Sequence, residues 1–236
     1  MAAIQPGAAA AGGVRGNANI PGLQQWIMEI PPVTRAWIIG SVAISMAVQC
    51  KYVAPLQLYF SYKSAFQNHQ PWRLVTAFLY FGPVTLDLAF HLFFIMRYSR
   101  LLEENNFAGK KADYLCLLIF NASILLVISP LLTLPFLSAS LAFSLVYIWS
   151  RRNPSQRLNI LGLVNITAPH LPYFLMGFSY FMYGGWDACM GDAVGAVAGH
   201  IYYFLMDVWP REMWYPGASK VEKGNVEGPI KAPRWM

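Results

Sequence analysis

Charged residues are scarce in this sequence. Asp, Glu, Lys and Arg make up 12% of its 236 residues, whereas an average soluble domain carries roughly 25%. Hydrophobic residues make up 56%, and they gather in windows close to the ~20 residues that a helix needs to cross the hydrocarbon core of a bilayer. The shortage of charge therefore excludes an ordinary soluble enzyme domain and predicts a polytopic membrane protein.

Motifs for metal or redox chemistry are also lacking. The three cysteines, Cys50, Cys116 and Cys189, lie far apart with no C-x-x-C pair, and we interpret them as isolated thiols in apolar surroundings. No metal site and no cofactor is predicted. The first twenty residues lack the charged-then-apolar order of a cleavable signal peptide, so we expect the first membrane helix to serve as the insertion signal.

Six apolar windows predict an all-α integral membrane protein with six transmembrane helices. Their expected bounds are residues 36–52, 83–98, 114–132, 134–150, 169–183 and 188–209. Several windows are short, so tilt or local thinning of the bilayer is expected. The predicted organisation is a cytosolic N-terminal tail with a short interfacial helix (1–33), a six-span membrane domain (34–209) and a flexible cytosolic C-terminal tail (210–236).

The distribution of lysine and arginine predicts the orientation, because these residues favour the cytosolic side of a membrane. With both termini in the cytosol, only three of the 17 Lys and Arg residues fall on the far side, namely Lys51, Lys63 and Arg73. All of the others fall on the cytosolic side. The net charge of +6 is thus explained by topology, and nucleic-acid binding is not expected.

Several segments of the chain resemble the Derlin family, in the same order and at similar spacing. They are residues 30–37 (IPPVTRAW), 71–73 (PWR), 97–103 (RYSRLLE), 112–115 (ADYL), 147–149 (YIW) and 199–205 (GHIYYFL). The resemblance implies a multi-pass protein of the endoplasmic-reticulum membrane. It also implies a rhomboid-like fold without protease activity, and a role in moving misfolded proteins back to the cytosol for ubiquitination and proteasomal degradation.

The pattern of a proteolytic rhomboid is missing. Such enzymes carry a Gly-x-Ser-Gly nucleophile motif on the fourth helix and a histidine on the sixth, which must lie within hydrogen-bond reach of each other. The sequence contains no Gly-x-Ser-Gly, and His200 is interpreted as a hydrogen-bonded packing residue. No catalytic residue is assigned. The alternative is an active intramembrane serine protease that uses Ser138 or Ser140 as an atypical nucleophile.

Polar residues inside the predicted spans are costly and therefore candidates for function. Asp87 and His91 lie one helical turn apart, either as a hydrogen-bonded pair or as residues that hydrate a membrane cavity. By resemblance they occupy the place of a rhomboid oxyanion-binding pair, and a carboxylate there would repel an oxyanion. His170 lies between Pro169 and Pro172, which indicates either a cytosolic helix start with proline in its first turn or a short and loosely held fifth helix. The resemblance to the rhomboid-like fold implies that the second and fifth helices flank a lateral opening.

Two further motifs suggest non-catalytic roles. Trp72 and Arg73 lie in the aromatic-rich segment 53–82, which we expect to form short helices at the luminal interface. They match the Trp-Arg motif of the family, either as an interfacial anchor or as a part that fixes the substrate- or lipid-contacting loop. Gly191, Gly195 and Gly199 recur every four residues and predict close helix packing against the fourth helix, with an oligomer contact as the alternative.

The resemblance also predicts partners. They are misfolded protein substrates, membrane lipids and a membrane ubiquitin-ligase complex. Many Derlins recruit a cytosolic AAA ATPase through a tail box that contains Gly and Arg, which residues 219–235 lack, so indirect recruitment is expected. We therefore predict a retrotranslocation factor that binds misfolded polypeptides in a lateral polar groove and thins the membrane. The sequence leaves open whether it forms homo- or hetero-oligomers.

Overall fold

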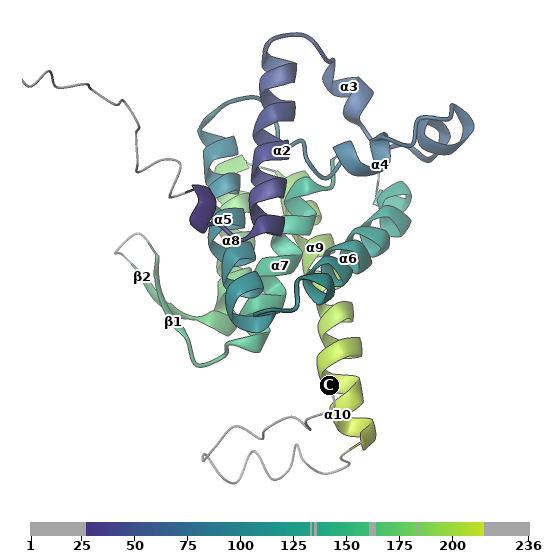
Figure 1. Cartoon of the computed structure of the whole chain (residues 1–236). Helices are drawn as coiled ribbons and strands as arrows, with labels where there is room; N and C mark the ends of the chain where they lie inside the picture. The colour runs from purple at the N-terminus through teal and green to yellow at the C-terminus, as the bar shows by residue number, and fades with distance from the viewer. Residues whose placement is uncertain (1–26, 133, 135, 161–163, 184, 215–236) are drawn as a thin grey trace, which may run out of the picture.

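The chain folds into a helical bundle. The computed structural model describes residues 27–132, 134, 136–160, 164–183 and 185–214 (Figure 1). The long helices of this part of the chain are α2 (Pro32–Gln49), α5 (Leu86–Leu101), α6 (Lys111–Leu132), α7 (Ser138–Arg152), α8 (Leu171–Tyr183) and α9 (Trp186–Tyr203). Each overlaps one of the six windows expected from the sequence. The interfacial helix expected before α2 is described only from residue 27, where a single helical turn reaches residue 29.

Helix α7 is the centre of the bundle. Every residue from Ser140 to Ser150 is buried, and α5, α6, α8 and α9 pack around it. Its serines are compatible with burial because each hydroxyl donates to a backbone carbonyl oxygen, as Ser144 does to Leu141 at 2.7 Å and Ser150 does to Tyr147 at 2.7 Å. Helices α5 and α8 both pack against α7, but among the described residues they make no substantial contact with each other.

One end of the bundle is covered by the segment between α2 and α5, and we call this the loop end. The segment contains α3 (Pro55–Leu58), a π-helical turn η1 (Lys63–Gln67) and α4 (Arg73–Thr76), seen at the top of Figure 1. It is tied to α2 by the indole of Trp37, which donates to the carbonyl of Phe78 at 3.1 Å. The start of α7 is tied to the same segment, since the hydroxyl of Ser138 donates to the carbonyl of Tyr80 at 2.6 Å.

The opposite end collects most of the cations of the described helices, and we call it the basic end. Here α2 and α6 begin and α5, α7 and α9 end. The cations at the helix termini are Arg35, Arg97, Arg100, Lys111, Arg151 and Arg152. Lys51, Lys63 and Arg73 belong to the loop end. Such a separation of charge is typical of a protein with a cytosolic side, although both the sidedness and the six-span topology remain predictions.

The basic end contains structure that the sequence did not predict. A hairpin of β1 (Arg157–Ile160) and β2 (Val164–Thr167) pairs antiparallel, with Leu158 opposite Ile166. A 3-10 turn η3 (Ala168–His170) leads into α8. After α9, a π-helical turn η4 (Phe204–Val208) and α10 (Trp209–Trp214) continue the helix beyond the bundle (Figure 1).

The predicted tail, residues 210–236, therefore begins with helix rather than flexible chain. Helix α10 runs to Trp214, and residues 215–236 lie outside the described part. The sixth apolar window was expected to end at residue 209, just before Pro210. Pro210 is the second residue of α10, which directly follows the π-helical turn η4, and the helix continues through it.

One described helix, α6, has both the length and the apolar composition of a membrane span. The others are shorter or less apolar: α5, α7 and α8 have 16, 15 and 13 residues. The 13 residues of α8 rise about 20 Å at ~1.5 Å per residue, less than the ~30 Å of a typical hydrocarbon core.

Candidate functional site

Arg73 holds together the segment that covers the loop end. Its Nε donates to the side-chain oxygen of Gln70 at 2.6 Å, and one terminal nitrogen donates to the carbonyls of Leu56 and Tyr59 at 2.9 and 2.8 Å. Helix α3 is thereby fixed to α4. The adjacent Trp72 side chain is 53% exposed, so the guanidinium faces the segment while the indole is presented outward.

The glycine stripe of α9 lies against α7. A Cβ atom on Gly195 would collide with the backbone oxygen of Ser140, and one on Gly199 would lie 2.8 Å from the backbone oxygen of Ser144. Both glycines are therefore required by the close approach of two backbones. Gly191 is different, because its Cβ would meet only the Ser140 hydroxyl at 3.5 Å, an ordinary contact distance.

The serines of α7 and His200 are not brought together. The Ser140 hydroxyl donates to the carbonyl of Gly191 at 2.7 Å. His200 is exposed, and its Nδ1 lies 2.7 Å from the hydroxyl of Tyr147. Tyr147 is seven residues after Ser140, about 10 Å along the helix at ~1.5 Å per residue. Within the described chain, no hydrogen bond joins a serine to His200, whereas a nucleophile and its base need a separation of roughly 3 Å.

The other polar residues expected to matter lie at two separate places. Asp87 and His91 face each other on α5, with His91 Nε2 3.5 Å from Asp87 Oδ1. The His91 ring also lies 5.4 Å from the Phe81 ring of the loop end. His170 is at the basic end, where its Nδ1 lies 2.7 Å from the Thr167 hydroxyl. The structure therefore groups Asp87 with His91 and keeps His170 apart from them.

Glu103 forms a buried polar cluster that the sequence analysis missed. Its carboxylate accepts hydrogen bonds from the backbone N–H groups of Val33 and Thr34 at 3.2 and 3.0 Å, and from the Thr34 hydroxyl at 2.8 Å. Ser99 links the Thr34 hydroxyl to that of Tyr114. A negative group at this position satisfies free N–H groups and the positive end of the α2 dipole.

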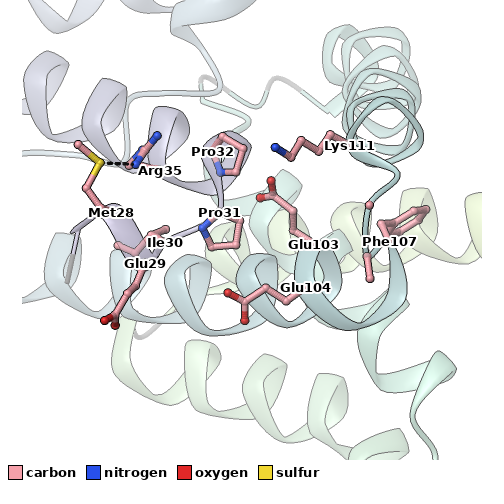
Figure 2. Close-up of a pocket in the computed structure, with 12 residues that line it drawn as sticks. Met28, Glu29, Ile30, Pro31, Pro32, Arg35, Glu103, Glu104, Phe107 and Lys111 are labelled. Carbon is pink, nitrogen blue, oxygen red and sulfur yellow. Dashed lines mark hydrogen bonds between the residues drawn. The ribbon is translucent and has the colours of Figure 1, made fainter. Parts of the chain in front are cut away.

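A surface cavity of about 490 Å³ opens beside this cluster, between the start of α2 and the segment that joins α5 to α6. In Figure 2, Glu103 points toward Pro32 at the start of α2, and Lys111 enters from the start of α6. Both signs of charge line the cavity, since Glu104 and Arg35 also border it. The sequence did carry one signal for this cluster, because all of its members belong to three of the resembling segments, 30–37, 97–103 and 112–115.

A second polar contact missed from the sequence joins α7 to the π-helical turn η4 that follows α9. Arg152 donates two hydrogen bonds to the carboxylate of Asp207, from Nε at 2.8 Å and from a terminal nitrogen at 3.0 Å. The guanidinium also stacks over the rings of Phe107 and Tyr202, at 4.8 and 5.8 Å from their centroids. This paired geometry fixes the end of α7, the turn before α6 and the π-helical turn η4 in one arrangement.

Three of the resembling segments, 30–37, 97–103 and 112–115, thus meet in space at the basic end of the bundle. The sequence profile of the Der1-like family matches residues 30–218. The chain belongs to the Der1-like, or Derlin, family. The match covers every helix from α2 to α10, so the whole bundle is the family's domain.

Individual relatives of this Der1-like protein are similar over most of their length. Derlin-2.2 of Arabidopsis thaliana is 41% identical over 200 residues, which cover 80% of this chain and 81% of the relative. Derlin-2.1 of Zea mays is 38% identical over 200 residues, with 80% and 79% covered. The probable derlin-2 homolog of Dictyostelium discoideum is 36% identical over 219 residues, with 88% and 85% covered. Family membership places the chain in the endoplasmic-reticulum membrane, with a role connected to degradation of misfolded proteins.

Proposed function

We propose that this Der1-like protein is a catalytically inactive retrotranslocation factor. It binds misfolded polypeptide in a lateral polar groove and locally thins the bilayer, without covalent chemistry. The proposal rests on one observation: the candidate catalytic side chains form hydrogen bonds with other groups and not with one another. Ser138 and Ser140 donate to backbone carbonyls and His200 is paired with Tyr147, so the protease alternative lacks a nucleophile with an adjacent base.

The arrangement of α5 and α8 supports a lateral entrance. Both helices pack against α7, and the described residues give no substantial contact between the two. Because the two helices are supported separately, they can separate from each other without disturbing the α7–α9 contact. Asp87 and His91 lie on α5 and supply polar groups for the groove.

The short helices support thinning. A helix shorter than the hydrocarbon core is accommodated by local thinning of the bilayer or by polar side chains that reach the interface. Helix α8 has 13 residues and α5 has 16, and these are the helices that flank the entrance. Thinning there lowers the cost of moving an unfolded chain, because every unsatisfied backbone polar group in hydrocarbon costs several kcal/mol.

The Arg73 contacts support a role for the loop end in meeting the client. The guanidinium holds α3 and α4 in a fixed relation through two backbone carbonyls, which leaves Trp72 exposed for contact with a client or lipid. In the proposed topology both termini are cytosolic and the loop end is luminal. The partners are a membrane ubiquitin-ligase complex and, through it, an AAA ATPase that supplies direction.

The proposal can be tested in cells whose own Der1-like proteins have been deleted. We expect the deletion to lengthen the half-life of a misfolded luminal client, and expect the unmutated protein to restore it. Ser138→Ala, Ser140→Ala and His200→Ala should each restore it as well, because none is expected to do chemistry. A cleaved fragment of a transmembrane client that disappears in a serine variant would overturn the proposal in favour of the protease.

A further inference from the structure

Asp192 is a charged residue within the bundle that the proposed mechanism does not use. It lies on α9 near the level of Ser140, because the preceding residue, Gly191, accepts the hydrogen bond of the Ser140 hydroxyl. It is only partly buried, and its carboxylate lies beside the side chain of Ser179 on α8. The carboxylate therefore lies at the α8–α9 contact, in the half of the bundle nearer the loop end.

No cation within the neighbouring helices can pair with this carboxylate. The stretch from Leu171 to Tyr203, which contains α8 and α9, has no lysine or arginine. Helices α6 and α7 carry them only at the basic end, as Lys111, Arg151 and Arg152. At the loop end Lys51 and Lys63 are exposed, and Arg73 already binds Gln70 and two carbonyls of the covering segment.

Asp207 lies further along the same continuous helix, and unlike Asp192 it is paired with a cation. Its carboxylate accepts two hydrogen bonds from Arg152. Asp192 is fifteen residues earlier, about 22 Å away along a helix that rises ~1.5 Å per residue, so Arg152 cannot serve both. A carboxylate has room for about four hydrogen bonds, and no described residue forms an ion pair with Asp192.

We infer that Asp192 is a recognition point within the membrane for a lysine or arginine on the transmembrane helix of a client. The inference rests on the proposed function and names a substrate class for it: membrane proteins whose spans carry a basic residue in the luminal half. Charge complementarity decides the occupant, because an ionisable residue at membrane depth is costly and is normally paired. A lysine or arginine of the client would form an ion pair with Asp192, and this pairing would lower the cost of both charges in the membrane.

The test uses two single-span clients that differ at one position in the luminal third of the span, Lys in one and Leu in the other. Their half-lives are measured in cells that lack Der1-like proteins and express the full chain. We expect Asp192→Asn to lengthen the half-life of the Lys client roughly fivefold, the factor that corresponds to about 1 kcal/mol of lost binding free energy. The Leu client should be unaffected, and Asp192→Glu should behave as the unmutated protein. Asp113→Asn, which changes an exposed acid at the start of α6, is the control and should leave both clients unaffected.

A charge-reversal variant distinguishes the loss of client recognition from misfolding of the variant. Asp192→Lys should slow degradation of the Lys client and restore rapid degradation of a third client that carries Asp at the same position. Equal half-lives of the Lys and Leu clients in Asp192→Asn, with the deletion still slowing both, would overturn the inference and leave the proposed function intact. If the deletion slows neither client nor the misfolded luminal client, the proposed function itself fails.

Discussion

The carboxylate of Glu103 caps the amino terminus of α2 across 69 residues of sequence, accepting the backbone N–H of Thr34 at 3.0 Å. Glu103 is only 5% exposed, and its acceptor oxygens are occupied by donors of α2. The contact fixes the start of α2 to the π-helical turn η2 (Leu102–Asn106), which directly follows α5. Through Ser99 and Tyr114 it also reaches α6.

Removal of this cap should destabilise the bundle strongly. Glu103→Ala leaves two backbone N–H groups without an acceptor, whereas the Thr34 hydroxyl can still donate to Ser99. Hydrogen bonds to a charged group contribute about 1.5–3 kcal/mol each. We expect a loss of about 3 kcal/mol, measured as a lower Tm of the purified protein in mild detergent. The matched control is Glu104→Ala, because Glu104 is exposed and pairs only with Arg100, a contact worth less than about 1 kcal/mol. Equal Tm values for the two variants would contradict the role of the cap.

The contact between α7 and α9 gives a prediction that distinguishes two glycines of the stripe. Gly195→Ala places a methyl group on the Ser140 backbone oxygen, and overpacking of this kind costs about 1–3 kcal/mol. Gly191→Ala meets only a hydroxyl at 3.5 Å, and should be close to neutral. Thermal unfolding in detergent measures both. If Gly195→Ala were as stable as Gly191→Ala, α7 and α9 would not be as close as the structure places them.

Arg73→Lys tests the geometry of the loop end. A lysine keeps the charge but lacks the planar fork that reaches Gln70 and two carbonyls at once. We expect slower degradation of a misfolded luminal client at normal expression and membrane insertion, and the same from Trp72→Ala. Lys63→Ala, which changes an exposed cation of the same segment, serves as control. Unchanged degradation with Arg73→Lys would reduce Arg73 to an interfacial anchor.

The sidedness of the bundle can be measured without reference to function. In a variant that lacks the native cysteines, a cysteine at Lys110 should react with a membrane-impermeant maleimide added outside sealed microsomes, because the basic end is expected in the cytosol. A cysteine at Lys63 should react only after the membrane is opened. Both positions are exposed, so access to the reagent does not favour either. The reverse pattern would turn the loop end toward the cytosol.

The helices were predictable from sequence, and their contacts were not. Long apolar windows locate α2, α5, α6, α7, α8 and α9. Burial and lipid exposure both favour apolar residues, and these windows are long enough to be recognised in a single sequence. The hairpin was not predicted because its strands have four residues each. Four residues are too few for an alternation of apolar and polar side chains to be recognised. The helical extension α10 was not predicted because a proline such as Pro210 usually indicates the end of a helix.

The polar contacts were missed for a different reason. Glu103 and Thr34 lie 69 residues apart, and Arg152 and Asp207 lie 55 apart. Contacts between residues so far apart produce no repeating pattern of residue types in a single sequence. The glycine stripe was visible because all its members lie on one helix, yet the spacing alone does not reveal that Gly191 is less constrained than Gly195. Asp192 was likewise overlooked, since its significance depends on which helices surround it.

Helices α9 and α10 and the π-helical turn η4 between them form one continuous rod. Its 18, 5 and 6 residues make a rod of about 43 Å at ~1.5 Å per residue, longer than the hydrocarbon core of a bilayer. A pull applied at α10 would be resisted first at the Arg152–Asp207 pair and then along the glycine seam with α7. Traction on the C-terminal side is thereby transmitted to the centre of the bundle, the helix against which α5 and α8 both rest.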